Sequence, residues 1–414
     1  MKTVVLDDDP TGTQSASDVG VLLDFNQDLI AEALTTSHSV YIQTNSRAID
    51  EEAARKLVAQ VREDSLTAGA KLGEDIQFVL RGDSTLRGHV FAESEVFLSE
   101  NSIILFVPAF PDGGRTTRGG VHYVNINGID MAAHETEYAL DPVFPFSTGK
   151  LDDYVKDKSG RPSVLVGLDE IRAGTRLAQL LVSAEPGTVI LPDAETNDDI
   201  RLIARAVQEA NEIGASIVIR CAAPLAAALA DVESAGLLAA PLVLSPSRTL
   251  LVCGSHTAGA TAQLAALEEN WGHPRFIDTE EALNDPVQTG RDAAEYLKHD
   301  LETRGFAMVA SGRHRSGAHN TLNHGERVMA ALATAVQELA NDVDIVIAKG
   351  GITSAEVARH GLSAKRAHVL GQVLPGVSVW SIDVSPEHAV TYIVVPGNVG
   401  SEDTLTNVVA AVGR

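Results

Sequence analysis

Acidic and basic side chains follow four short apolar runs in the first half of the chain. The runs end in Asp7-Asp8-Asp9, in Thr44-Asn45-Ser46-Arg47, in Arg81-Gly82-Asp83-Ser84-Thr85-Leu86-Arg87, and shortly before Arg115 and Arg118. Ionised aspartate accepts hydrogen bonds from sugar hydroxyls, binds metals and takes a proton from an alcohol, whereas the guanidinium fork of arginine matches a carboxylate. The alternative for any single residue is a solvated loop or a helix cap. Five arginines on successive strand ends favour an anion-binding patch.

A second kind of site is predicted where apolar runs of the second half end in glycine. Residues 343–348 read as a buried strand, followed by Lys349-Gly350-Gly351-Ile352-Thr353 at the start of a helix. The other two turns are at Gly254-Ser255 and at Gly397-Asn398. Glycine permits a tight turn, and the free N–H groups of a helix start suit a phosphate. The alternative is an ordinary strand-to-helix connection. Neither GxxxxGK[ST] nor GxGxxG occurs in the sequence, so a nucleotide would be bound in an atypical manner.

The elements that must position these residues alternate between short β-branched runs and longer helical patterns. This alternation predicts α/β layers, with mostly parallel sheets flanked by helices. Ligands of such sheets bind beyond the carboxyl ends of the strands. Strands are expected at 3–7, 40–44, 76–80, 102–107, 163–167, 188–191 and 216–220, then at 249–253, 306–310, 343–348, 377–382 and 390–395. Residues 108–150 break the rhythm and predict a hairpin or excursion beside the site.

Length and composition bound the class of protein. A chain of 414 residues exceeds one ordinary core, and the alternation restarts after a proline-containing stretch, which predicts domains at 1–240 and 246–414. The net charge of −24 argues against nucleic acid or an anionic membrane as partner. The two cysteines have no metal-binding spacing, and no leader or run of eighteen apolar residues is present. We therefore expect a cytoplasmic protein, and a homo-oligomer is compatible with the sequence.

Taken together, the separated motifs resemble those of the four-carbon acid sugar kinase family, from one end of the chain to the other. The motifs are Asp8-Asp9-Pro10-Thr11-Gly12, Asp83 to Gly88, Pro108 to Thr117, Gly254-Ser255, Lys349 to Ser354, and Pro396 to Gly400. Two positions depart from the family pattern, because Arg81 and Val395 stand where many members have lysine. The first change keeps a positive charge and the second removes one.

The resemblance implies an N-terminal domain that binds the acid sugar, a C-terminal domain that binds ATP, and a ligand crevice between the two domains. The implied reaction is phosphorylation of the terminal hydroxyl of a threonate, erythronate or 3-oxo-tetronate. The substrate-binding residues would be Asp8, Asp9, Arg47, Arg81, Gly82, Asp83 and Ser84. The ATP-binding residues would be Ser255, Lys349, Gly350, Gly351, Ile352, Thr353, Gly397 and Asn398.

In the mechanism that we expect, Asp9 accepts the proton of the acceptor hydroxyl, with Asp8 and Asp83 as alternatives. Arg47 and Arg81 would hold the sugar carboxylate. Mg²⁺ is expected with the nucleotide and needs few protein ligands. The sequence does not identify these ligands, and Asp403 is named only as a guess. Two other functions stay open: a two-domain sensor that binds an acid sugar without turnover, and an acid-sugar lyase or aldolase.

Overall fold

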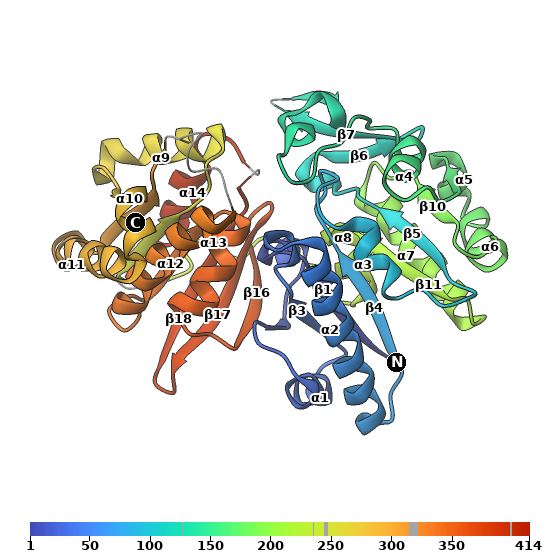
Figure 1. Cartoon of the computed structure of the whole chain (residues 1–414), viewed down its shortest axis with the longest axis horizontal. Helices are drawn as coiled ribbons and strands as arrows, with labels where there is room; N and C mark the ends of the chain where they lie inside the picture. The colour runs from blue at the N-terminus through green and yellow to red at the C-terminus, as the bar shows by residue number, and fades with distance from the viewer. Residues whose placement is uncertain (127, 235, 244–246, 314–321, 398–399) are drawn as a thin grey trace. The chain divides into compact units, whose positions relative to one another are not determined.

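The computed structural model describes residues 1–414 except 127, 235, 244–246, 314–321 and 398–399 (Figure 1). The described chain forms two compact units. Unit 1 contains residues 1–16 and 25–233, and unit 2 contains residues 17–24 and 234–414. The α/β fold class predicted from the alternating pattern is confirmed, because each unit is built on a sheet with helices packed against it.

The sheet of unit 1 is parallel throughout its described strands. Its strand order is β3-β1-β4-β11-β5-β10-β9. The strands are β1 (Lys2–Asp7), β3 (Ser39–Gln43), β4 (Ile76–Arg81), β5 (Ile103–Val107), β9 (Ser163–Val166), β10 (Val189–Pro192) and β11 (Ile217–Cys221). Strands β3 and β5 are buried along their whole length, as expected for a parallel sheet that is covered on both faces. All the strands predicted for this half of the chain are present within one or two residues of their expected bounds.

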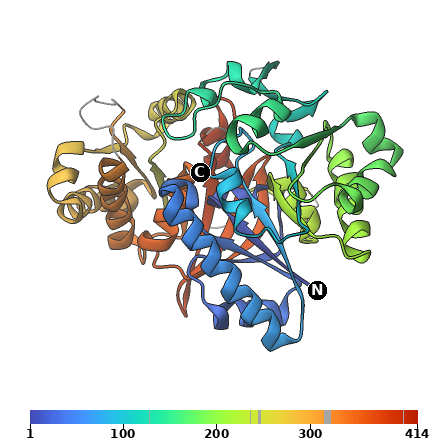
Figure 2. The same ribbon diagram turned by 45° about the vertical axis from the view of Figure 1, so that its right-hand side comes forward.

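Some helices of unit 1 begin at a residue whose side chain accepts a hydrogen bond from an N–H group of the first turn. The helices are α1 (Gln27–Thr36), α2 (Glu51–Leu72), α3 (Val90–Glu95), α4 (Leu151–Ser159), α5 (Leu168–Ala173), α6 (Arg176–Ser183), α7 (Asn197–Glu212) and α8 (Ala223–Leu229). The Asp50 side chain accepts from the Ala53 N–H at the start of α2, and Gly73 ends that helix in the left-handed region. Helix α2 packs on β1 and β4, as both ribbon views show (Figures 1 and 2).

The segment between β5 and α4 leaves the main sheet of unit 1. It forms a separate antiparallel sheet from β6 (Arg115–Arg118), β7 (Val121–Ile126) and β8 (Ile129–Ala132). Short 3₁₀ turns flank it at Pro111–Gly113, Ala133–Glu135 and Glu137–Leu140. This sheet lies beyond the carboxyl ends of β1 and β4 in both views (Figures 1 and 2). The excursion predicted at residues 108–150 is therefore confirmed.

Unit 2 has a mixed sheet with the strand order β13-β14-β12-β15-β18-β17-β16-β2. The strands are β2 (Val19–Leu22), β12 (Thr249–Cys253), β13 (Arg275–Ile277), β14 (Phe306–Ser311), β15 (Ile345–Lys349), β16 (Arg366–Leu374), β17 (Val377–Ser385) and β18 (His388–Val395). The five strands from β13 to β18 in this order are parallel, and β17, β16 and β2 continue the sheet in antiparallel pairing.

The helices of unit 2 surround a core that is made mostly of these strands. They are α9 (Ala258–Trp271), α10 (Thr279–Asn284), α11 (Pro286–Arg304), α12 (Leu322–Leu339), α13 (Gly351–Glu356), its π-helical continuation Val357–Gly361, and α14 (Thr404–Ala411). Helices α9 and α14 pack against each other, and their buried residues join a core cluster with residues of β12, β14, β15, β17 and β18. The apolar side chains of the glycine-ended strands thus lie inside unit 2.

One exchange between the two halves of the sequence was not predicted. Residues 17–24 belong to unit 2, because β2 pairs with β16 in antiparallel register. The Asp18 N–H donates to the Val369 carbonyl at 2.8 Å, and the Leu23 N–H donates to the Lys365 carbonyl at 2.9 Å. The predicted first domain at 1–240 includes this segment, whereas the structure assigns it to unit 2. Strand β16 itself was missed, because a glycine at 371 and alternating polar residues interrupt its apolar pattern.

Candidate functional site

The polar strand ends of unit 1 lie next to one another because the strands are parallel and in register. Asp7 at the end of β1 stands opposite Gln43 of β3 on one side and Arg81 of β4 on the other. Arg81 in turn stands opposite Cys221 at the end of β11. The carboxyl ends of four strands therefore share one edge of the sheet, which is where open α/β sheets bind ligands.

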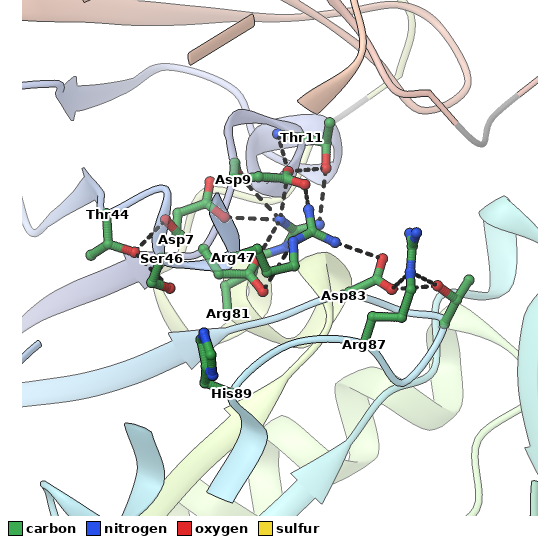
Figure 3. Close-up of polar contacts among 12 residues, drawn as sticks. Asp7, Asp9, Thr11, Thr44, Ser46, Arg47, Arg81, Asp83, Arg87 and His89 are labelled. Carbon is green, nitrogen blue, oxygen red and sulfur yellow. Dashed lines mark hydrogen bonds and ion pairs between the residues drawn. The ribbon is translucent and has the colours of Figure 1, made fainter. Parts of the chain in front are cut away.

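Arg81 contacts the three consecutive aspartates at this edge, of which Figure 3 labels Asp7 and Asp9. Its Nη1 lies 3.0 Å from Asp7 Oδ1, 3.2 Å from Asp8 Oδ1 and 3.1 Å from Asp9 Oδ1. Its Nη2 donates to Thr11 Oγ1 at 3.2 Å. Arg81 is 2 % exposed and its Nε has no hydrogen-bond partner among the described residues. Arg81 thus holds the three carboxylates in place, and almost none of its own side chain is exposed to a ligand.

This buried group has three carboxylates around the single guanidinium of Arg81, and the excess negative charge affects the pKa of Asp7. Burial raises the pKa of the Asp7 carboxyl from 3.8 to about 7, since the favourable charge of Arg81 offsets only part of the lost hydration and Asp8 adds repulsion. Burial acts to lower the pKa of Arg81, but Asp7 and Asp8 more than compensate, and the pKa is raised. Arg81 therefore stays charged.

Arg47 links the aspartates of β1 to the turn after β4. It follows Asn45, which adopts a left-handed conformation with φ of 51° at the start of a short 3₁₀ turn (Ser46–Ala48). The guanidinium forms ion pairs with Asp9 through Nη2, with Asp83 Oδ1 at 3.1 Å and, more weakly, with Asp8 Oδ2 at 3.6 Å. Arg47 is thus the bridge between Asp9 and Asp83 (Figure 3).

The turn after β4 holds Asp83 between two arginines. Arg47 lies on one side, and the Arg87 Nε donates to Asp83 Oδ2 at 2.9 Å on the other (Figure 3). The Thr85 hydroxyl also donates to Asp83 Oδ2. Although burial opposes ionisation, Arg87 and Arg47 hold the pKa of Asp83 far below its usual range. Asp83 is therefore a poor proton acceptor at neutral pH.

The antiparallel excursion supports this turn from the other side. His122 of β7 donates from Nε2 to the Ser84 carbonyl at 2.8 Å, and its Nδ1 lies 3.1 Å from the Thr117 hydroxyl. Burial lowers the pKa of His122 to about 4, so the imidazole is neutral and Nδ1 accepts from Thr117. The Tyr154 hydroxyl donates to the Leu86 carbonyl at 2.8 Å, where Leu86 has a φ of 67°. Long-range hydrogen bonds thus fix the backbone of the turn.

Sequence reasoning missed a second buried arginine behind the site. Arg220 of β11 is 2 % exposed, pairs with Glu93 of α3 through Nη1, and lies 3.5 Å from Asp8 Oδ2. Its guanidinium fills the space beside Gly82, where an added Cβ would lie 2.5 Å from Nη2. The signal was an arginine inside the apolar run Ile217-Val218-Ile219, because a charged residue in a fully buried strand needs a partner.

Three glycine turns of unit 2 meet at the carboxyl ends of β12, β15 and β18, which are neighbours in the sheet. The Gly350 N–H donates to the Val395 carbonyl at 2.9 Å, and the Thr257 hydroxyl donates to the Gly397 carbonyl at 3.0 Å. A Cβ on Gly254 would lie 2.3 Å from Thr353 Oγ1, and one on Gly397 would lie 3.0 Å from Ser255 Oγ. The structure therefore brings Ser255, Gly350, Thr353 and Gly397 together.

The other residues predicted for nucleotide binding differ in their exposure. Lys349 is fully buried, and its Nζ donates to the Pro396 carbonyl at 2.6 Å, so it ties two of the turns together from inside. Burial lowers the pKa of Lys349 to about 8. Ile352 at the start of α13 is 47 % exposed. Asn398 lies outside the described residues.

The carboxylates of the described residues do not form a preassembled metal cage. The described residues contain no group of three or more His, Cys, Asp or Glu side chains that could hold a metal ion. Asp403, at the exposed start of α14, is therefore not part of such a group. Within the same residues, none of the helices is both long and apolar enough to cross a membrane.

Comparisons with known proteins agree with a division into two functional parts. A family model described as a sugar-binding N-terminal domain matches residues 3–229, and one described as a nucleotide-binding C-terminal domain matches residues 250–405. The chain is similar to a D-threonate kinase of Bordetella bronchiseptica, with 26% identity over 393 residues that cover 93% of this chain and 89% of that protein.

Two further similarities come from other bacteria. A D-erythronate kinase of Heliobacterium modesticaldum is 29% identical over 270 residues, which cover 63% of this chain and 58% of that protein. The solved structure of a Haemophilus influenzae protein matches with a TM-score of 0.62 at 18% sequence identity, over 99% of this chain and 100% of that chain. The last comparison supports the fold.

Proposed function

The chain belongs to the four-carbon acid sugar kinase family, and from this premise we propose that it transfers the γ-phosphoryl group of ATP to the terminal hydroxyl of a four-carbon acid sugar. The substrate is of the threonate, erythronate or 3-oxo-tetronate type. The observation that supports this proposal most strongly is the group of ion-paired aspartates and arginines at the carboxyl edge of the unit 1 sheet. Carboxylates accept from sugar hydroxyls, and guanidinium groups balance the acid.

In this proposal unit 1 binds the acid sugar through Asp8, Asp9, Arg47 and the turn Gly82 to Ser84, and Arg81 holds the aspartates in place. Asp9 is the proton acceptor that we favour. It is held by the Thr11 N–H at 2.8 Å, by Arg81 and by Arg47, so its position is fixed before the substrate arrives. Asp83 stays the alternative acceptor, although Arg87 and Arg47 hold its pKa far below the usual range. In phosphoryl transfer the protein contributes mostly positioning and charge neutralisation, so a weak but well-placed base is sufficient.

Unit 2 binds ATP in this proposal, with the phosphates at the glycine turns. Ser255, Gly350, Thr353 and Gly397 lie close enough together to surround one phosphate chain with hydroxyl and backbone N–H donors. Lys349 acts on this site by holding the Pro396 carbonyl. Ile352 offers an apolar surface beside the turns.

Mg²⁺ is part of the proposal as a companion of ATP. Since the described residues offer no carboxylate cage, the ion would be held mainly by phosphate oxygens and water, which is the usual mode for Mg²⁺ with nucleotides. When bound, the ion neutralises phosphate charge. The residues of the chain act by binding, orientation and proton acceptance.

The proposal is tested by ADP release with ATP and Mg²⁺ across a panel of four-carbon and five-carbon sugar acids. We expect turnover of one or two acids by the wild type and a loss of at least about 100-fold in kcat for Asp9→Asn, as for removal of a general base. The matched control is Asp28→Asn, since Asp28 is 78 % exposed and pairs with Lys71 at the surface.

The outcomes separate the proposed kinase from its alternatives. Binding of a sugar acid by folded protein without ADP release would favour the sensor. Conversion of the acid without ATP consumption would favour the lyase or aldolase. Equal turnover by wild type and Asp9→Asn would remove Asp9 from the mechanism while leaving the kinase proposal intact.

A further inference from the structure

We propose that Arg87, and not Arg81, binds the carboxylate of the sugar acid, so that the substrate lies with its acid end at Arg87 and its hydroxyl end at Asp9. This inference rests on the proposed function and deepens it. It starts from the exposure of the candidate arginines. The side chains of Arg81 and Arg220 are 2 % exposed, whereas that of Arg47 is 14 % and that of Arg87 is 22 % exposed.

Hydrogen-bond donors distinguish Arg87 from Arg47. Both terminal nitrogens of Arg47 form ion pairs with carboxylates, one with Asp83 and one with Asp9. Arg87 uses its Nε for Asp83 and for Thr85 Oγ1. Within the described part of the chain, its terminal nitrogens make no hydrogen bond. The two terminal nitrogens extend beyond these contacts, as the close-up shows (Figure 3). Arg87 therefore presents its outer pair of donors, which is the pair that receives a carboxylate end-on.

The guanidinium of Arg87 is also held in place before a ligand binds. Its Cζ lies 5.1 Å from the centre of the Tyr138 ring, which fixes the plane by a cation–π contact. Its Nη1 lies 3.6 Å from Asp141 Oδ2, too far for a hydrogen bond. Asp141 is itself fixed, because its Oδ1 accepts from the Val143 and Phe144 N–H groups at 2.9 and 3.0 Å. A substrate carboxylate would thus gain hydrogen bonds that Arg87 does not yet make.

Charge balance favours the same end of the site. The inner group pairs two arginines, Arg81 and Arg220, with four carboxylates, those of Asp7, Asp8, Asp9 and Glu93. The outer group has Arg47, Arg87 and Arg115 near the carboxylates of Asp83 and Asp141. Counted in this way, the inner group carries a net charge of −2, or −1 when Asp7 is protonated, and the outer group carries a net charge of +1. An anion is therefore accepted at the outer end, and hydroxyl donors at the inner end.

The test is equilibrium binding of threonate and erythronate to the full chain by calorimetry without nucleotide, with threitol and erythritol as the neutral probes. We expect Arg87→Gln to weaken binding of the acid by about 10- to 100-fold, as for loss of a charge-assisted pair, and to leave binding of the alcohol unchanged. Arg87→Lys keeps the charge but loses the fork, so it should fall between the two. Thermal unfolding of each variant confirms that it is folded.

Arg275 of β13 in unit 2 provides the matched control. It also stacks on a tyrosine, with its Cζ 5.4 Å from the centre of the Tyr296 ring. Arg275→Gln should bind the acids as the wild type does. Wild-type acid affinity in Arg87→Gln, or equal losses for acid and alcohol, would overturn the proposal. Absence of acid binding by the wild type would overturn it as well.

These outcomes are separate from a failure of the proposed function. Acid binding that depends on Arg87, without ADP release from any acid, would support the role of Arg87 and refute the kinase. ADP release that is unaffected by Arg87→Gln would support the kinase and refute the role of Arg87.

Discussion

Removal of Arg220 should destabilise unit 1 strongly, because this residue is buried in an ion pair with Glu93. The sequence analysis did not single it out. Arg220 and Glu93 form a buried ion pair, and each is at most 3 % exposed at its side chain. Glu93 already has one carboxylate oxygen without a hydrogen-bond partner among the described residues. Arg220→Met would leave Glu93 buried and unpaired and would remove one neighbour of Asp8. Breaking a buried pair in this way typically costs about 3–5 kcal/mol.

The double variant decides whether the cost comes from the unpaired charge. In Arg220→Met/Glu93→Leu neither buried charge remains, and the apolar replacements fill similar volume. We therefore expect the double variant to recover more than half of the stability lost in Arg220→Met, since replacement of a buried pair by apolar residues is often close to neutral. Arg201→Met is the control, because Arg201 is 51 % exposed in its pairs with Asp198 and Glu233 and should cost no more than about 1 kcal/mol.

The assay must report on unit 1. Both tryptophans, Trp271 and Trp380, lie in unit 2, so their fluorescence does not follow unfolding of the unit that carries Arg220. Urea unfolding, monitored by hydrogen exchange in peptides from β4 and β11, measures the free energy of unfolding of unit 1. A cost below about 1 kcal/mol for Arg220→Met, or a double variant that is no more stable than the single one, would refute the unpaired-charge reasoning.

Three other substitutions test single features of the two units. Burial raises the pKa of Asp7 from 3.8 to about 7, so the folded protein keeps a proton there that the unfolded chain has lost, and Asp7→Asn should gain stability relative to the wild type as pH rises through this interval. A pH-independent difference in urea unfolding would contradict it. For His122 the pH dependence is opposite, because burial lowers its pKa from 6.5 to about 4. The wild type should therefore lose stability relative to His122→Gln as pH decreases between these values, and parallel stability curves would count against a neutral buried His122. Gly254→Ala should destabilise unit 2 by about 1–3 kcal/mol in unfolding followed by tryptophan fluorescence, because its Cβ would lie 2.3 Å from Thr353 Oγ1. Thr353→Ala in the same chain should restore part of that loss, and an undisturbed Gly254→Ala would show that the turn yields.

The positions of the strand ends were predictable from the sequence because they depend on local pattern. Buried parallel strands are short runs of apolar and β-branched residues, and each ends where polar residues begin. The residue pattern alone therefore assigns Asp7-Asp8-Asp9, Arg47 and Arg81 to one edge of a sheet. The glycine turns of unit 2 were found in the same way.

Which charged residues are buried and which can reach a ligand was not predictable from the residue pattern. The site has four arginines that differ mainly in burial. Arg47 and Arg87 have exposed surface, whereas Arg81 and Arg220 have almost none. Burial depends on which strands and loops cover a side chain. In this protein those covering segments come from distant parts of the sequence.

The sequence by itself determined the alternation of strands and helices, the α/β class, and the set of polar residues at the strand ends, because each follows from residues within a few positions of one another. Tertiary structure alone decided that β2 completes the sheet of unit 2, that His122 holds the Ser84 carbonyl, and that Arg220 pairs with Glu93. Those contacts join residues 38 to 351 positions apart. Their free energy depends on desolvation and on the exact partner, which are properties of the packed chain and not of any local pattern.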